Sequence, residues 1–144
     1  MKYEFEVKGL PVGKQRPRAS IIHGYARVYT PKKTQSYEAL VCGMLMQKYG
    51  NIKPLESAIR VEIYVYYQLE KTCFKKRGIN LDGQRKLNGE IYPTKKPDID
   101  NIAKSILDAL NSVVYRDDSQ VVELIVKKSY IEDLPKVKVI IENI

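Results

Sequence analysis

Apolar and polar residues alternate along much of the chain, which is the pattern of a strand with one buried face. The alternation predicts four strands and one β-hairpin, namely strands over residues 2–8, 58–68, 119–130 and 136–143 and a hairpin over 20–30. Residues 58–68 are the clearest strand, because they are rich in Val, Ile and Tyr. The hairpin is expected to turn at His23 and Gly24, and the last two strands to form an antiparallel pair around Asp133.

Apolar residues at helical spacing predict two helices. The first opens with Thr30 as its N-cap and Pro31 at its first position, and it stops before Gly50. The second covers residues 100–112 and buries a stripe of apolar side chains, Ile102, Ile106, Ala109 and Leu110. Residues 69–96 are basic and show no clear period, so they are expected to form a long functional or mobile loop, part of which could be a short helix that the pattern does not place.

The length of 144 residues predicts a single domain, residues 1–144, that can bury a core. The elements follow one another as strand, hairpin, helix, strand, long loop, helix and two strands. This order predicts an α+β fold in which two main helices pack against a mainly antiparallel or mixed β-sheet. No apolar run reaches about 18 residues, and no signal-peptide core is present at the N-terminus, so a cytoplasmic protein without a membrane segment is expected.

The scarcity of cysteine and histidine excludes several classes of hydrolase. Cys42, Cys73 and His23 are too few for a persuasive zinc site or for Ser-His-Asp and Cys-His mechanisms. His23 is interpreted as a turn residue, and no disulfide is expected in a chain that is not exported. Any hydrolytic chemistry must therefore come from carboxylates, lysine and a metal ion.

The charge balance favours an anionic partner, with nucleic acid as the first candidate. The chain has 25 Lys and Arg against 17 Asp and Glu, and no acid lies between residues 7 and 37. Tyr25, Tyr29 and Tyr37 fall within that stretch, and they could stack on bases or pack inward as core residues. The residues expected to position a DNA backbone are Lys14, Arg16, Arg18, Lys32, Lys33, Lys95 and Lys96.

Five acids fall between residues 97 and 118, inside this basic protein. Asp98 and Asp100 would share one side of an extended segment, so both can face one cation such as Mg²⁺. Asp98 or Asp100 could equally be a helix cap, and the pair at 117–118 could be a plain turn. Lys104 could stabilise developing negative charge or simply pair along the helix, and Asp108 is assigned a structural role because it lies two turns from Asp100.

These acids are part of a composite motif that resembles the RusA-type Holliday-junction resolvases. The motif comprises Lys96-Pro97-Asp98-Ile99-Asp100-Asn101-Ile102-Ala103-Lys104, Leu107-Asp108-Ala109-Leu110-Asn111 and Asp117-Asp118-Ser119-Gln120-Val121-Val122-Glu123. The basic stretch Pro11-Val12-Gly13-Lys14-Gln15-Arg16-Pro17-Arg18 resembles phage and prophage members of the family.

The resemblance implies a homodimer that binds four-way DNA junctions and cuts two opposing strands with Mg²⁺ or Mn²⁺, in recombination and repair. It implies that Asp98, Asp100 and Asp118 bind the metal and that Lys104 is catalytic. Asp117 is a secondary candidate for the metal site. The role of residues 69–86 and the number of metal ions stay open.

Two other functions are compatible with the same residues. One is a non-catalytic nucleic-acid-binding accessory protein, in which the acids are caps and turns. The other is a nuclease for branched or flap DNA without strict junction preference. Metal-dependent cleavage separates the first alternative from the resolvase, and a comparison of junction, flap and linear substrates separates the second.

Overall fold

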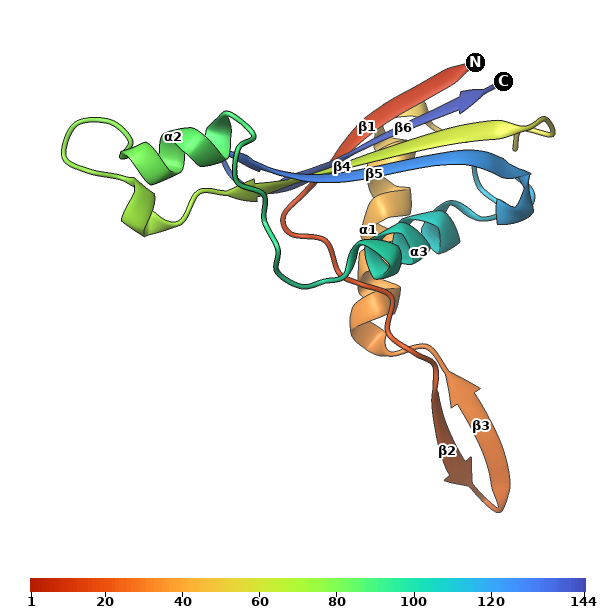
Figure 1. Cartoon of the computed structure of the whole chain (residues 1–144). Coiled ribbons are helices and arrows are strands. Elements are labelled where there is room, and N and C mark those ends of the chain that lie inside the picture. The colour runs from red at the N-terminus through yellow and green to blue at the C-terminus, as the bar shows by residue number, and fades with distance from the viewer.

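A mixed four-stranded sheet with the order β1-β6-β4-β5 forms the centre of the fold (Figure 1). The structure is a computed structural model that describes residues 1–144. The strands are β1 (Lys2–Lys8), β4 (Ile59–Gln68), β5 (Val121–Ile131) and β6 (Lys136–Asn143). β6 pairs antiparallel with both β1 and β4, whereas β4 and β5 run parallel. The predicted α+β class and mixed sheet are confirmed.

The predicted antiparallel pairing of the last two strands is wrong. β5 and β6 are consecutive in the chain, but β4 lies between them and pairs with both. β4 buries every second residue along its length, and a strand with so continuous an apolar face gains most from the centre of a sheet. Alternation specifies which face of a strand is buried, but not which strand lies beside it.

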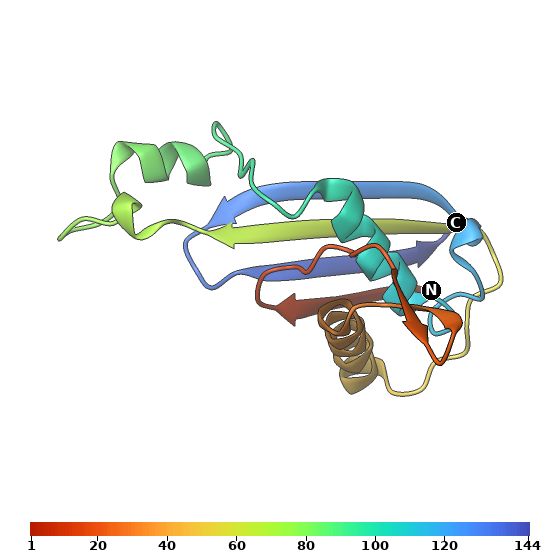
Figure 2. The same cartoon turned by 90° about the horizontal axis from the view of Figure 1, so that it is seen from below.

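Two helices cover one face of the sheet, α1 (Lys32–Tyr49) and α3 (Ile99–Leu110) (Figure 2). The predicted stripe on α3 is buried as expected, and Val41 and Leu45 of α1 are fully buried with it. Each buried Ile, Val or Leu side chain of this kind stabilises the fold by roughly 1.5–3 kcal/mol. The opposite face of the sheet carries ion pairs, such as Arg60 with Glu123 at 2.5 Å.

The beginning of α1 differs from the prediction. The helix starts at Lys32, with Pro31 rather than Thr30 in the N-cap position and without a side-chain cap. Thr30 still ends the preceding segment, where its carbonyl accepts a hydrogen bond of 3.0 Å from the Gln35 side chain. The shift has a simple cause, since Pro31 has an extended ψ of 143° and so lies just outside the helix.

Two segments project from this body (Figure 1). One is the hairpin of β2 (Arg18–Ile22) and β3 (Tyr25–Tyr29), which turns at His23 and Gly24 as predicted. The other is residues 69–96, here called the knob, which contains the 3-10 turn η1 (Lys71–Cys73) and the helix α2 (Leu81–Leu87). A further 3-10 turn, η2 (Asp118–Gln120), precedes β5. None of the helices combines the length and apolar character that a membrane crossing requires.

Candidate functional site

The basic N-terminal loop is fixed against the first turn of α3. The Lys14 amide donates a hydrogen bond of 2.9 Å to the Asn101 carbonyl. Gly13 comes so close to this turn that an added Cβ would lie 2.8 Å from Cβ of Pro97 and 3.2 Å from Cβ of Asn101. Only glycine therefore fits without movement, and this close approach sets the loop beside the predicted catalytic residues.

Two adjoining hollows lie along this contact. The first has a volume of about 540 Å³ and is lined by Lys33, Lys96 and Asp98, together with Lys14 and the neighbouring loop. The second, of about 420 Å³, is lined by residues that include Arg16, Lys104 and Asp108. Lys14, Gln15 and Asn101 line both. The groove thus brings basic side chains of the loop and α1 to the acidic beginning of α3.

Asp98 and Asp100 have carboxylates that the protein leaves free. Asp98 occupies the N-cap position of α3 but makes no cap hydrogen bond, and Asp100 lies in the first turn. Neither side chain takes part in any hydrogen bond or ion pair. The helix dipole stabilises negative charge at this end. The simple capping role is therefore not fulfilled at Asp98, and both carboxylates remain available to a ligand.

The paired acids before β5 differ from one another. The Asp117 carboxylate caps η2 by accepting the Ser119 amide at 3.1 Å, and Gln120 completes a capping box. Hydrogen bonds from the side chain and backbone of Ser119 lower the pKa of Asp117. The Asp118 carboxylate accepts no hydrogen bond and forms no ion pair. Asp117 is thus occupied by local structure, whereas the Asp118 carboxylate is free.

The three free carboxylates are not gathered into one cluster within this chain. No group of three or more His, Cys, Asp or Glu side chains is close enough to hold a metal ion. Asp118 lies instead near the buried Tyr115, whose pKa is raised by burial and then by the charges of Asp118 and Asp108. Mg²⁺ commonly uses one or two protein carboxylates and completes its shell with water and phosphate. The chemistry of Asp98 and Asp100 fits such an ion.

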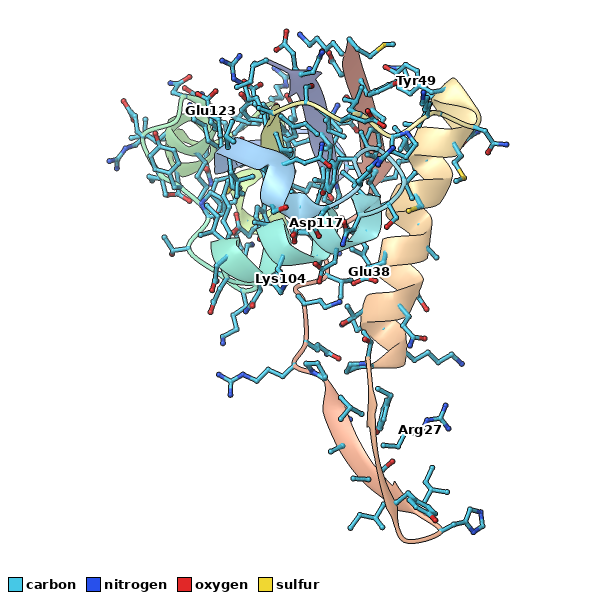
Figure 3. The ribbon with its side chains drawn as sticks, turned by 90° about the vertical axis from the view of Figure 1, so that its right-hand side faces the viewer. Arg27, Glu38, Tyr49, Lys104, Asp117 and Glu123 are labelled. Atoms are coloured by element: carbon cyan, nitrogen blue, oxygen red, sulfur yellow. The ribbon has the colours of Figure 1, made fainter.

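Lys104 and Asp108 form the ion pair along α3 that the sequence allowed, with Nζ and Oδ1 3.5 Å apart. The Lys104 side chain is 61% exposed, so its ammonium stays accessible from solvent. Asp108 also accepts Lys14 at 3.1 Å, which agrees with the structural role assigned to it. Figure 3 shows Lys104 on α3, Glu38 on α1, and Asp117 in the segment that returns to the sheet.

Lys14 joins three segments of the chain. Its ammonium lies 2.6 Å from the Glu38 carboxylate on α1 and 3.1 Å from Asp108 on α3. Partial burial works against this charge, but the hydrogen bonds to Glu38 and Asp108 outweigh it and raise the pKa of Lys14. The side chain is only 16% exposed. Lys14 therefore anchors the loop, beyond the DNA contact that the sequence predicted.

The other predicted DNA-binding cations divide into free and paired groups. Lys95 lies 3.4 Å from Glu70 at the base of the knob. Five make no ion pair: Arg16, Arg18, Lys32, Lys33 and Lys96.

The three tyrosines of the basic stretch lie in different environments. Tyr37 is buried in the core, whereas Tyr25 is 79% exposed and Tyr29 is 42% exposed. Tyr37 is therefore a core residue, whereas stacking of Tyr25 and Tyr29 on bases stays a prediction.

Glu38 and Asn101 contribute to the site, although the sequence analysis did not select them. Glu38 is the one acid between residues 7 and 55, and an isolated acid in a basic stretch was the available signal. Asn101 follows Asp100 directly and accepts the loop amide through its carbonyl. The position of the helix in the knob was also not predicted. Asn80 marks its start, because the Asn80 side chain caps α2 by accepting a hydrogen bond of 2.9 Å from the Gly83 amide.

Comparison with known proteins gives two findings. The family model described as "Endodeoxyribonuclease RusA" matches residues 8–142 of this chain. A relative from Bacillus subtilis (strain 168), named "Uncharacterized protein YqaN", is 33% identical over 141 residues. That alignment covers 98% of this chain and 96% of the relative.

Proposed function

Because this chain belongs to the RusA endodeoxyribonuclease family, we propose that it resolves Holliday junctions by Mg²⁺-dependent hydrolysis of two opposing strands. Asp98, Asp100 and Asp118 are the proposed metal-binding carboxylates. The observation that carries the proposal is that these three acids lack protein partners, whereas Asp108 and Asp117 are paired or capping. Asp98 lines the basic groove and Asp100 lies in the adjoining first turn of α3, so free carboxylates lie close to cations, as a metal-dependent nuclease requires.

The bound Mg²⁺, for which Mn²⁺ could substitute, would activate a water and neutralise the scissile phosphate. Asp98 and Asp100 would hold the ion from the start of α3. Asp118 is the third proposed ligand, and because it is not clustered with the other two in this structure, it would have to move toward the ion on binding. The protein's own contribution is to leave these carboxylate oxygens without hydrogen-bond or ion-pair partners. Because Asp117 is committed to the η2 cap, it serves as a positioning residue for Asp118 in this proposal.

Lys104 is proposed to stabilise negative charge that develops on the phosphate oxygens during cleavage. Its ammonium is exposed on α3 one turn after Asp100, and its contact with Asp108 at 3.5 Å is long for an ion pair. Because this contact is weak, the Lys104 ammonium can leave Asp108 and contact a phosphate at little cost in free energy. Asp108, which Lys14 also contacts, limits the region in which the Lys104 head group moves.

The free cations around the groove are proposed to hold the DNA backbone. Arg16, Lys33 and Lys96 line the two hollows and form no ion pair, so binding phosphate breaks no existing contact. Such contacts position DNA without reading its sequence. Such contacts would favour DNA of a particular shape rather than a base sequence.

A two-fold dimer is proposed, since a four-way junction presents two equivalent strands for cutting. The β2–β3 hairpin supports this. Its register places Ala19, Ile21, Ala26 and Val28 on one face, and Ile21 and Val28 are 80% and 70% exposed. An isolated two-stranded hairpin is only marginally stable in water. A second copy of the chain that covers this apolar face would stabilise it.

A panel of labelled DNA substrates tests the function. We expect cleavage of a four-way junction with Mg²⁺, none with EDTA, and much slower cleavage of flaps and linear duplex. Binding of the junction without cleavage under every metal condition would favour the non-catalytic accessory protein. Equal cleavage of junction and flap would favour the branched-DNA nuclease.

A further inference from the structure

The outer end of the knob is a short turn that carries consecutive basic residues, Lys75, Lys76 and Arg77. The turn projects beyond the end of the sheet, away from both helices that hold the candidate site (Figures 1 and 2). Its two sides pair through a bridge between Phe74 and Ile79, and the Lys75 amide donates to the Gly78 carbonyl at 3.1 Å. The three cations therefore sit at the tip of a closed, hydrogen-bonded turn.

The base of the turn is held rigidly. Cys73 is fully buried, and an added Cβ on Gly83 of α2 would lie 2.9 Å from Cβ of Cys73, so helix and turn are in close contact. Asn80 links the helix and the turn as well. Its backbone amide donates a hydrogen bond of 2.9 Å to the Cys73 carbonyl, and its side-chain amide donates one of 2.7 Å to the Thr72 carbonyl. A preorganised turn loses little conformational entropy when it binds.

The knob is attached to the sheet through Glu70. Its carboxylate lies 3.0 Å from the Lys86 ammonium and 3.4 Å from that of Lys95, and it accepts a hydrogen bond of 3.3 Å from the Tyr130 hydroxyl on β5. Lys86 also pairs with Asp82 at 3.0 Å. These cations are thus used inside the protein, and they fix the orientation of the knob relative to β5.

The cations at the tip show the opposite behaviour. Lys75, Lys76 and Arg77 are exposed and take part in no ion pair, and the sequence has no acid between Glu70 and Asp82. Phe74, next to them, is 42% exposed. Paired cations at the base and free cations on a rigid tip indicate a surface whose counter-charge comes from a partner. A row of free cations at short intervals suits the regular phosphates of a nucleic acid.

We propose that the 75–77 turn contacts the phosphate backbone of a duplex arm of the branched DNA, away from the crossover. This inference rests on the proposed function, because the groove by α3 holds the cutting site. The knob extends away from that groove, and each arm of a junction extends away from the crossover. The turn would therefore lengthen the binding surface along one arm without taking part in the chemistry.

The test compares two triple variants in junction binding without divalent metal. The knob variant is Lys75→Ala, Lys76→Ala and Arg77→Ala. The matched control is Lys2→Ala, Lys8→Ala and Lys53→Ala, three exposed cations in no ion pair elsewhere, so both variants lose the same charge from the net +8. Binding is measured by fluorescence anisotropy against salt, on junctions with arms of two helical turns and of less than one turn.

On long arms we expect the knob variant to bind roughly tenfold more weakly than wild type at moderate salt, with a salt slope reduced by about 2–3. The control should stay within about twofold, and on short arms the two variants should bind equally. Equal binding of both variants on long arms would overturn the inference. A loss that persists on short arms would overturn the assignment to a duplex arm.

The outcome also separates this inference from the proposed function. Wild-type protein that neither binds nor cuts junctions contradicts the proposed function itself. Wild-type protein that binds and cuts, with a knob variant indistinguishable from the control, contradicts the knob contact alone. The single charge reversal Lys76→Glu is a second variant that must weaken long-arm binding, and a thermal unfolding midpoint equal to that of wild type verifies that the variant protein is folded.

Discussion

The Lys14 ammonium and the Asp108 carboxylate lie 3.1 Å apart, and this contact ties the N-terminal loop to the middle of α3. Glu38 of α1 contacts the same ammonium at 2.6 Å. Lys14 thus has two negatively charged partners in a place where it is largely shielded from water. The loop, α1 and α3 are held together at the groove by one side chain.

Replacing Lys14 should therefore affect stability as well as DNA binding. Lys14→Met leaves Glu38 and Asp108 without their shared cation, and we expect it to lower the free energy of unfolding by about 1–3 kcal/mol. Arg16→Ala is the matched control, because Arg16 has no ion pair. The Arg16→Ala protein should bind the junction more weakly, with a smaller dependence of binding on salt. Its free energy of unfolding should change by less than about 0.5 kcal/mol. Urea unfolding and anisotropy measure the two effects. Equal stabilities of the two variants would remove Lys14 from its anchoring role.

Gly13→Ala should push the loop away from α3. The new Cβ would lie 2.8 Å from Cβ of Pro97, so one of the two segments must move. We expect a stability loss of about 1–3 kcal/mol, as for overpacked cores, together with slower junction cleavage. Gly43→Ala is the control, since no atom lies within 4 Å of an added Cβ there. It should raise the stability of α1 by roughly 0.5–1 kcal/mol. A Gly13→Ala protein as stable and active as wild type would contradict the close packing.

The knob should loosen in acid. Burial opposes the charge of Glu70, but its own backbone amide, Lys86 and Lys95 outweigh it and hold the pKa at about 2, below the ordinary 4.5. A carboxyl whose pKa falls on folding stabilises the fold above pH 4.5, and this contribution is lost as the pH falls toward 2. At about pH 6 the urea concentration at the unfolding midpoint should be higher for wild type than for Glu70→Gln. This difference between the two midpoints should be smaller at about pH 3. A difference that is constant with pH would exclude this role of Glu70.

The apolar face of the hairpin should control the oligomeric state. Ile21→Ser with Val28→Ser removes the two large exposed apolar side chains of that face, and we expect a monomer of 16.6 kDa in place of a dimer. Ile22→Ser, on the opposite face, should leave the dimer intact. Size-exclusion chromatography with light scattering measures the mass. A double variant that elutes with the mass of wild type would exclude the hairpin from the dimer contact.

Much of the fold follows from local patterns in the sequence. The alternation at Tyr3, Phe5 and Val7 predicts the buried face of β1, and Ile102 and Ile106 lie on the predicted stripe of α3. Strand neighbours are a non-local property, so the position of β4 between β5 and β6 could not be read from the alternation. The helix in the knob is short, and its stability depends on tertiary contacts rather than on a repeated apolar period.

The candidate site was predictable in its residue types but not in its partners. The sequence places acids at 98 and 100 at the beginning of a helix, yet only the fold shows that they are unpaired and separates Asp118 from the capping Asp117. The contact of Lys14 with Glu38 joins residues 24 positions apart on different elements, and spacing carries no signal for it. A basic residue that looks free in a sequence can thus be committed to an ion pair.

Cleavage of a four-way junction by Asp100→Asn tests the central claim most directly. Asparagine keeps the size of the side chain and removes the charge that is proposed to hold the metal ion. Asp133→Asn, in the loop before β6, is the control variant. In Mg²⁺ we predict that Asp100→Asn binds the junction at least as well as wild type and cuts it at least about a hundredfold more slowly. The Asp133→Asn protein should cut like wild type. Cleavage by Asp100→Asn at the wild-type rate would contradict the account.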